Sequence, residues 1–223
     1  MSSILKMKTK FLSILLIISY SVFAQNGQIK YSPSFKFKDG IFENFQQVKN
    51  NAPIPKLQIV TDIDYNSFDF FERLLEQETI TYYDNLGVSK EIKTKNIWGF
   101  SDKGILYINI NGTFNRIPVF GKISHFIADK TVVDYDPYYN TGMYNNYYGP
   151  QPYTTKTVLI QYLLDFKTGK IYEFNYQAVE KLISDDIDLY EEFSKLSKRK
   201  KKKLKFLYIR KYNKKHPIYF PKK

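Results

Sequence analysis

The chain has 223 residues, a formal net charge of +12 and no cysteine. The absence of cysteine excludes disulfide bonds, thiol catalysis and attachment of a lipid to a cysteine. The length allows one substantial hydrophobic core or two small ones.

The first 24 residues have the pattern of a cleaved signal peptide. Lys6, Lys8 and Lys10 give a basic start, residues 11–18 are almost entirely apolar, and residues 22–24 are small or apolar at the expected cleavage site. The apolar run is about thirteen residues long, whereas a membrane-spanning helix needs about twenty. We therefore expect an exported protein that is periplasmic, associated with the outer membrane or secreted.

Charge is distributed very unevenly along the chain. Residues 195–223 hold fourteen Lys or Arg and no Asp or Glu, whereas residues 25–194 have a net charge of −5. In a cytosolic protein such a basic tail would favour nucleic acid. An exported protein meets acidic glycans, anionic phospholipid headgroups and acidic faces of partner proteins instead, so we expect envelope anions or an acidic partner protein and no nucleic acid. Peripheral contact with a membrane is compatible with this pattern.

The first half of the chain gives short elements. An Asp-Gly turn at 39–40 precedes a helical turn through Phe42, Phe45 and Val48, which Pro53 ends. Further on, the pattern predicts a strand around 57–63, a helix or a strand at 68–77, and a strand at 79–83.

Residues 95–130 predict an antiparallel meander. Strands are expected at 97–100, 106–110, 114–120 and 122–128, with Asn111-Gly112 as a hairpin turn. Pro118 cannot donate a backbone hydrogen bond, so its strand is expected at a sheet edge or with a bulge.

The remaining elements follow a Tyr-rich loop. This loop is expected at 134–155, a buried strand at 157–166 and its hairpin partner at 171–174. Three helical patterns come next: 176–183, a helix with a capping box from Asp188 to Glu191, and 197–213 before Pro217.

Together these elements predict an α+β protein. We expect a mainly antiparallel, curled sheet built of hairpins, with two or three C-terminal helices. The expected organisation is a signal peptide at 1–24, a sheet-rich body at 25–183 and a basic helical segment at 184–223 packed on the body.

Three motifs carry a resemblance. The segments Asp39-Gly40-Ile41-Phe42 to Asn50-Asn51-Ala52-Pro53, Ile97-Trp98-Gly99-Phe100 and the ending 207–217 resemble exported proteins of unknown function from Bacteroidota. The resemblance covers most of the chain after residue 24. It implies lineage and compartment and assigns no activity and no site.

Residues suited to catalysis are few. The chain has two histidines, His125 and His216, and no nucleophile elbow, metalloprotease motif or phosphate-binding glycine loop. His125 fits a partly buried, hydrogen-bonded position on a strand, and His216 fits a helix end. Asp134 and Asp136 are the carboxylates that a glycan hydrolase could place near His125.

A second acidic group, Asp185, Asp186 and Asp188, lies at a helix start. Negative charge is favourable there, and the periodic calcium loop of an EF-hand is missing. We therefore predict no catalytic residue, no metal ligand and no cofactor.

Two surfaces remain as candidates for binding. Exposed tyrosines of the loop, represented by Tyr144, Tyr147 and Tyr148, could stack on sugars or dock peptides. In the tail, successive basic residues must encircle a helix and stay exposed. These tail residues are Lys198, Arg199, Lys200, Lys201, Lys202, Lys203, Arg210 and Lys211.

The preferred hypothesis is a non-catalytic envelope protein that binds a partner or an anionic envelope component through its basic C-terminal helix. The alternatives are a hydrolase of envelope polymers and a structural or adhesive protein that uses the Tyr-rich loop.

Overall fold

The computed structural model describes residues 27–135 and 153–222. Residues 1–26, which contain the expected signal peptide, lie outside the described part, as do residues 136–152 of the expected Tyr-rich loop. The described helices are α2 (Phe45–Lys49), α3 (Phe70–Leu75), α4 (Tyr176–Leu182), α5 (Ile187–Ser194) and α6 (Lys198–Lys215), with 3₁₀ turns η1 (Lys56–Gln58) and η2 (Thr94–Asn96).

The strands are short except for two. They are β1 (Gln28–Lys30), β2 (Gly40–Phe42), β3 (Ile59–Val60), β4 (Thr79–Tyr83), β5 (Ser89–Lys93), β6 (Gly99–Asp102), β7 (Ile105–Ile110), β8 (Thr113–Arg116), β9 (Ile123–Tyr135), β10 (Tyr153–Asp165), β11 (Ile171–Glu173) and β12 (Tyr219–Pro221). All of their pairings are antiparallel, in sheets of order β2-β6-β7-β8, β3-β4-β5, β11-β10-β9 and β1-β12.

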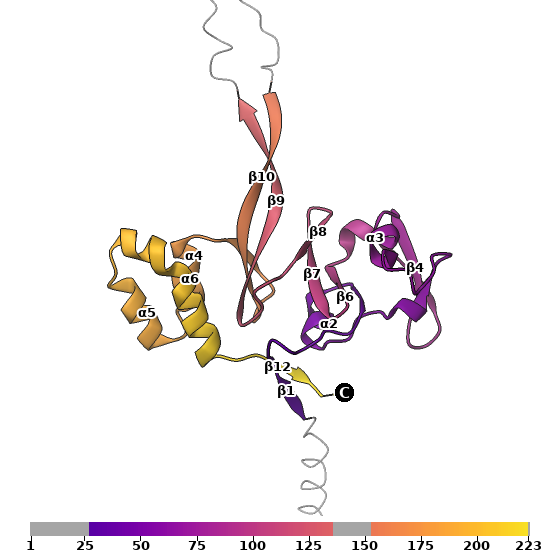
Figure 1. Cartoon of the computed structure of the whole chain (residues 1–223), viewed down its shortest axis with the longest axis horizontal. Coiled ribbons are helices and arrows are strands. Elements are labelled where there is room, and N and C mark those ends of the chain that lie inside the picture. The colour runs from indigo at the N-terminus through magenta and orange to yellow at the C-terminus, as the bar shows by residue number, and fades with distance from the viewer. Residues whose placement is uncertain (1–26, 136–152, 223) are drawn as a thin grey trace, which may run out of the picture.

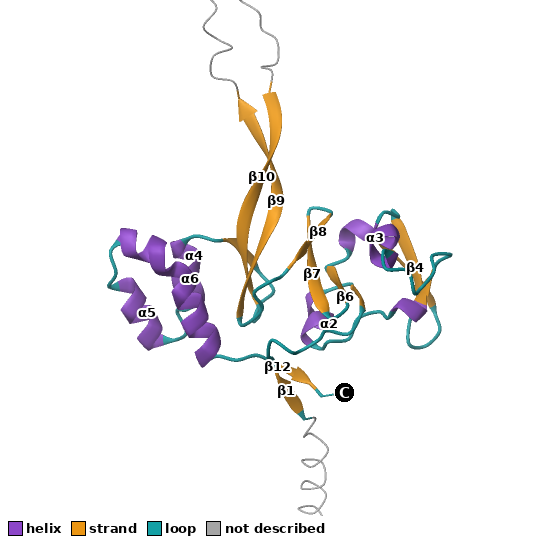
Figure 2. Ribbon diagram, viewed as in Figure 1, coloured by secondary structure: helices purple, strands orange, loops and turns teal. Residues whose placement is uncertain are grey.

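The predicted α+β class is confirmed: curled antiparallel sheets are combined with three C-terminal helices. Helices α4, α5 and α6 form a helical lobe on one side of the β9–β10 ribbon, and α3 with β4 lies at the opposite end of the molecule (Figure 1). The strands between these ends are evident in Figure 2. Among the described residues, no helix is both long and apolar enough to cross a bilayer.

The central meander differs from the predicted one. Strand β8 ends at Arg116, two residues before Pro118, and β9 then begins a separate sheet. Proline has no N–H to donate, so the ladder stops before it. The hairpin at Asn111-Gly112 is confirmed, with φ of 53° and 89° at its two central residues.

The ribbon is longer than its sequence pattern indicates. Strands β9 and β10 pair over thirteen residues each, from Ile123 with Asp165 to Tyr135 with Tyr153. The expected loop at 134–155 was therefore too long at both ends. The outer residues of the ribbon are mostly polar or β-branched, and the two strands pair with each other there. A pattern of buried residues in the sequence does not reveal such pairing.

The structure defines the type of one predicted segment and the bounds of another in the first half of the chain. Residues 70–75 are helical, with Phe70, Phe71 and Leu74 buried on one face. The strand expected at 57–63 is only Ile59–Val60, because a 3₁₀ turn occupies the residues before it.

The C-terminal helices begin at polar caps. Asn175 caps α4 by accepting from the Ala178 N–H at 2.8 Å. The capping box predicted from Asp188 is wrong: Asp186 is the cap of α5 and accepts from the Leu189 N–H at 3.2 Å, while Asp188 lies in the first turn. The caps accept from N–H groups that would otherwise be unpaired, and the negative charge of Asp188 interacts favourably with the helix dipole.

After α6 the chain returns to its beginning, because β12 pairs with β1. Phe220 is fully buried and its ring contacts those of Tyr31, Phe35 and Phe37 at centroid distances of 4.5–6.4 Å. This cluster belongs to a core that also includes Phe42, Leu106 and Phe126, whereas separate cores lie beneath α3 and between the helices of the helical lobe.

Candidate functional site: the basic helix α6

Helix α6 has eighteen residues, which corresponds to a length of about 27 Å. Ser197 caps it and accepts from the Lys200 N–H at 3.4 Å. One face is fixed to the helical lobe by three buried side chains, Tyr208, Ile209 and Tyr212. Residues that lie on the opposite face are exposed, among them Lys203, Arg210 and Leu207, which is 46% exposed.

The six successive basic residues at 198–203 differ in exposure and in ion pairing. Lys201 faces α4, where its ammonium lies 2.6 Å from the Glu180 carboxylate. The other five side chains are exposed, and none forms an ion pair with a carboxylate of the described residues. We call these six residues, which encircle the helix, the girdle; five of the six are therefore available to an anion.

Arg210 and Lys211, the two binding residues predicted further along α6, also differ in ion pairing. Arg210 is exposed, and its guanidinium lies 4.8 Å from the centre of the Phe206 ring. Lys211 pairs with Glu192 at 2.7 Å, and the same carboxylate accepts from the Tyr208 hydroxyl at 2.9 Å. Lys211 is thus partly neutralised within the molecule, whereas Arg210 is not.

A basic hollow adjoins the girdle. Lys198, Lys202 and Lys205 recur at intervals of four and three residues on one side of α6, and they line a hollow of about 500 Å³ together with Asn175, Tyr176 and Gln177. The Lys205 ammonium donates to the Phe174 carbonyl at 3.0 Å and lies 3.8 Å from that residue's ring centre. Burial lowers the pKa of Lys205 below that of a solvated lysine.

The charge of the girdle opposes folding of its own helix. The first turn of α6 contains no acidic residue and begins with three cations at 198–200. Positive charge at a helix N-terminus is unfavourable by about 0.3–1 kcal/mol per residue, and like charges four residues apart repel. A cluster that weakens its helix is expected of a binding site rather than of a structural element.

The opposite end of α6 is neutralised by acidic residues of the lobe. The carboxylate of Asp186, whose side chain is only 2% exposed, lies 2.7 Å from the Lys215 ammonium and 2.6 Å from the His216 ring nitrogen. Asp185 accepts from the Tyr212 hydroxyl at 2.7 Å, and Asp188 lies 3.0 Å from Lys215. This acidic group therefore fixes α6, and the described residues contain no cluster of potential metal ligands.

His125 lies at the base of the ribbon. Its ring nitrogen is 3.0 Å from the Gln161 amide oxygen, and its ring packs edge-on against Phe174 and Phe206. Burial lowers the pKa of His125, and the charge of Lys205 acts in the same direction. The imidazole is therefore held by packing and a hydrogen bond, as predicted for a partly buried histidine.

The structure does not bring His125 and Asp134 together. Both belong to β9, nine residues apart in a continuous strand, which corresponds to a separation of about 30 Å. Asp136 and the loop residues Tyr144, Tyr147 and Tyr148 lie outside the described residues.

The sequence reasoning missed the basic hollow. The signal was present, because the spacing of Lys198, Lys202 and Lys205 places them on one side of a helix. The other side of the hollow is formed by Asn175, Tyr176 and Gln177 at the start of α4, more than twenty residues earlier in the chain, and the spacing of the lysines does not indicate them. In comparisons with protein-family models, with curated proteins and with solved structures, nothing matched this chain.

Proposed function

We propose that this chain is a non-catalytic binding protein that acts after export, at the cell envelope, and attaches to an anionic envelope component through α6. The observation that supports the proposal is the cluster of cations at the start of α6: all but Lys201 are exposed and have no ion-pair partner among the described residues, and those of the first turn lie where the helix dipole disfavours them.

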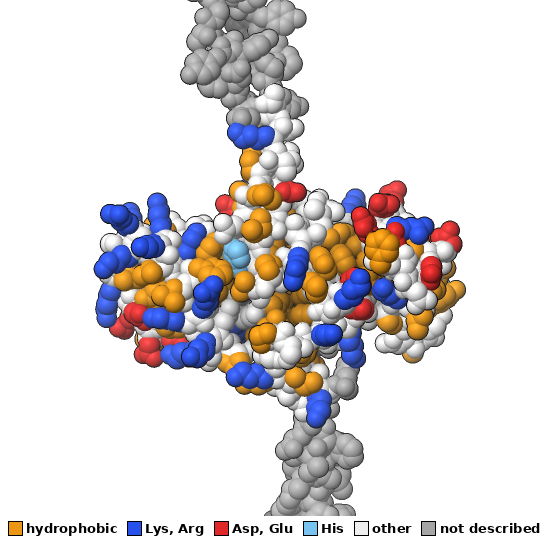
Figure 3. All heavy atoms as spheres, in the orientation of Figure 1, with side chains coloured by type: hydrophobic (Ala, Val, Ile, Leu, Met, Phe, Trp, Pro, Cys, Tyr) orange, Lys and Arg blue, Asp and Glu red, His pale blue; other side chains and the backbone are white. Residues whose placement is uncertain are grey.

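The binding surface consists of two parts. The exposed cations of the girdle contact a surface of phosphate or carboxylate groups, and each Lys or Arg near an anionic bilayer contributes about 1 kcal/mol. The basic hollow takes one such group, with Lys198 and Lys202 as donors of charge-assisted hydrogen bonds. Blue side chains over the helical lobe in Figure 3 mark this region of the molecule.

The hydrolase alternative stays a prediction, because His125 and Asp134 lie far apart along β9 while Asp136, the other expected carboxylate, lies outside the described residues. The adhesive role of the Tyr-rich loop also stays a prediction.

The test is sedimentation of the protein with vesicles of anionic phospholipid, with zwitterionic vesicles as the reference, over increasing salt. We compare Lys200→Glu/Lys203→Glu with Lys93→Glu/Lys95→Glu, a double variant with the same net charge on exposed residues of β5 and η2. The α6 variant is expected to lose at least about 30-fold in affinity, since two cations of about 1 kcal/mol each are removed.

Unfolding does not explain such a loss. Glu at position 200 would face the Ser197 cap as the third residue of the helix, completing a capping box, and would favour the dipole. The thermal midpoint of the α6 variant should therefore be equal to or above that of the unchanged protein. Equal losses in the two double variants, or binding that is insensitive to salt, would contradict the proposal.

A further inference from the structure

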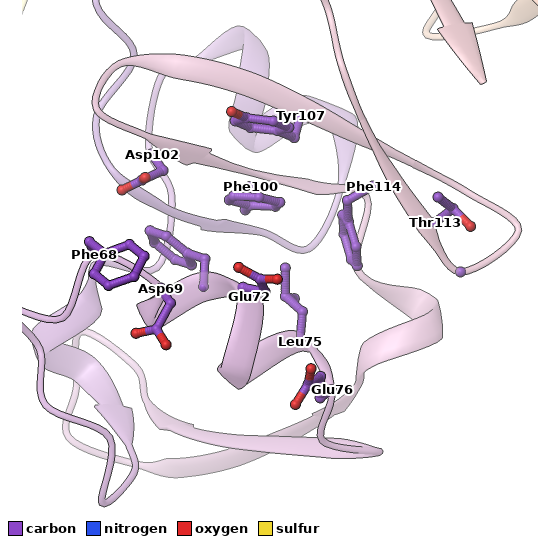
Figure 4. A pocket seen from close by; sticks show the side chains of 12 residues that line it. Phe68, Asp69, Glu72, Leu75, Glu76, Phe100, Asp102, Tyr107, Thr113 and Phe114 are labelled. Atoms are coloured by element: carbon purple, nitrogen blue, oxygen red, sulfur yellow. The ribbon is translucent and has the colours of Figure 1, made fainter. Parts of the chain in front are cut away.

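A second binding surface lies at the other end of the molecule. Helix α3 and strands β6–β8 enclose a pocket of about 530 Å³, open to solvent on one side (Figure 4). Five aromatic side chains contribute to its walls: Phe68, Phe71, Phe100, Tyr107 and Phe114. We call this the acidic aromatic pocket, because carboxylates of α3 and β6 also line it.

The rings provide flat apolar faces. Phe100 and Tyr107 are stacked across β6 and β7, with centroids 4.6 Å apart and planes inclined by 2°. Phe71 and Phe114 flank Phe100 at 5.1 and 5.4 Å. Phe68, at the rim, is 85% exposed although it is large and apolar. Such faces carry negative electrostatic potential and attract cations.

The carboxylates give the pocket its charge. Asp69 and Glu76 flank α3 and Glu72 lies within it, and all three line the pocket. In Figure 4 the Glu72 carboxylate lies beneath Phe100, whereas those of Asp69 and Glu76 point away from the rings, at the rim. Asp69 accepts from the Ser67 hydroxyl. Glu72 and Glu76 are exposed, and neither has a cationic partner within the described residues.

The molecule already binds one ammonium group in this manner. The Nζ atom of Lys56 lies 4.7 Å from the centre of the Phe71 ring and 4.9 Å from that of Phe70. It is also 3.7 Å from Asp102, a carboxylate that lines the pocket. Aromatic faces and a carboxylate near this wall therefore combine to hold a cation, and the pocket offers the same kinds of group.

We propose that the acidic aromatic pocket binds a Lys or Arg side chain of a partner polypeptide. The aliphatic stem packs against Phe114, and the cationic head lies beside the Glu72 carboxylate and the Phe100 ring, with Glu76 at the rim. Carboxylates only accept hydrogen bonds, so the occupant must supply several donors and positive charge. The volume is within the usual range for a specific pocket. This inference is independent of the function proposed for α6, which attracts anions.

The test is isothermal titration of the full chain with a capped hexalysine peptide at low salt. The same peptide with every lysine acetylated is the reference for the ligand. The variant Glu72→Gln/Glu76→Gln is compared with Glu78→Gln/Glu91→Gln, which removes the same charge from exposed residues outside the pocket. We expect at least a tenfold rise in Kd for the pocket variant and less than a twofold change for the control.

A third variant separates aromatic from purely ionic attraction. Phe114→Leu keeps every charge and is expected to weaken hexalysine binding severalfold, with the thermal midpoint measured to verify folding. Equal weakening in both double variants would mean general attraction to the acidic surface and would overturn the proposal. So would equal affinity for the acetylated peptide, or no binding at all.

Discussion

At the scale of single residues, Ser101 and Ser124 are both fully buried, yet their hydroxyl groups have different surroundings. The Ser124 hydroxyl donates to the Gly121 carbonyl at 3.0 Å and accepts from the Gly121 N–H at 3.1 Å. The Ser101 hydroxyl has no hydrogen-bond partner in the described part of the chain. A buried polar group without a partner costs about 1–3 kcal/mol.

We predict opposite effects of the same substitution at these two positions. Ser101→Ala removes an unsatisfied hydroxyl and should raise the free energy of unfolding by about 1 kcal/mol, whereas Ser124→Ala breaks two hydrogen bonds and should lower it by about 1–3 kcal/mol. Urea unfolding followed by tryptophan fluorescence measures both. A destabilised Ser101→Ala variant would show that this hydroxyl has a partner.

At the scale of elements, Asp186 joins two helices, because it caps α5 and accepts from residues at the end of α6. Burial by itself would raise the pKa of Asp186, but hydrogen bonds from Lys215 and His216 outweigh it and hold the pKa at about 2. In the unfolded chain the same carboxyl titrates near 3.8. Its contribution to stability is therefore complete above about pH 4 and is lost as the pH falls to about 2.

Asp186→Asn is expected to lower the free energy of unfolding at pH 7 by about 1.5–3 kcal/mol and to flatten its decline between about pH 4 and 2. The control is Asp188→Asn, because Asp188 also contacts Lys215 but is 89% exposed, and exposed ion pairs contribute about 0–1 kcal/mol. Chemical unfolding at a series of pH values gives both quantities. An unchanged pH profile in Asp186→Asn would contradict the assignment.

The elements also show how far the sequence predicts the fold. The boundaries of α6 follow from Ser197 and Pro217, and β4 was predicted at its observed bounds, because local signals determine them. The choice of Asp186 rather than Asp188 as a cap depends on packing against α6. The outer half of the ribbon depends on pairing between strands, which has no local signature.

The candidate site was predictable to the same extent. The basic residues of α6 and their exposure follow from six consecutive cations that cannot share one face. That Lys201 alone is neutralised depends on Glu180, which another helix brings to it. The acidic aromatic pocket combines residues of α3 with residues of β6–β8, over forty positions apart at the extremes, and only the folded chain unites them.

At the scale of the whole molecule, two surfaces of opposite charge lie at opposite ends, α6 in the helical lobe and the acidic aromatic pocket beside α3 (Figures 1 and 3). This separation keeps the exposed cations of α6 apart from the carboxylates of the pocket. The central core lies between these two surfaces, and we expect the stability of the fold that carries them to depend on it.

Substitution of Phe220 tests the contribution of this core. Phe220 belongs to β12, and its ring packs among those of Tyr31, Phe35, Phe37, Phe120 and Phe166. Phe220→Ala is expected to cost about 3–5 kcal/mol through the cavity it leaves. Tyr219→Ala, at a neighbouring residue that is 49% exposed, should cost less than 1 kcal/mol. Thermal unfolding compares the two, and equal midpoints would show that β12 is not part of the core.

The pairing of β1 with β12 has a consequence for the order of events during synthesis. Gln28–Lys30 is synthesised about 190 residues before its partner Tyr219–Pro221. The central core therefore lacks Phe220 until the residues from β1 to β12 have all been made. We therefore expect this core to be completed only after β12 has been synthesised, and to stay incomplete until then. A translocation channel accepts chains in that state, so late closure suits the export that we propose.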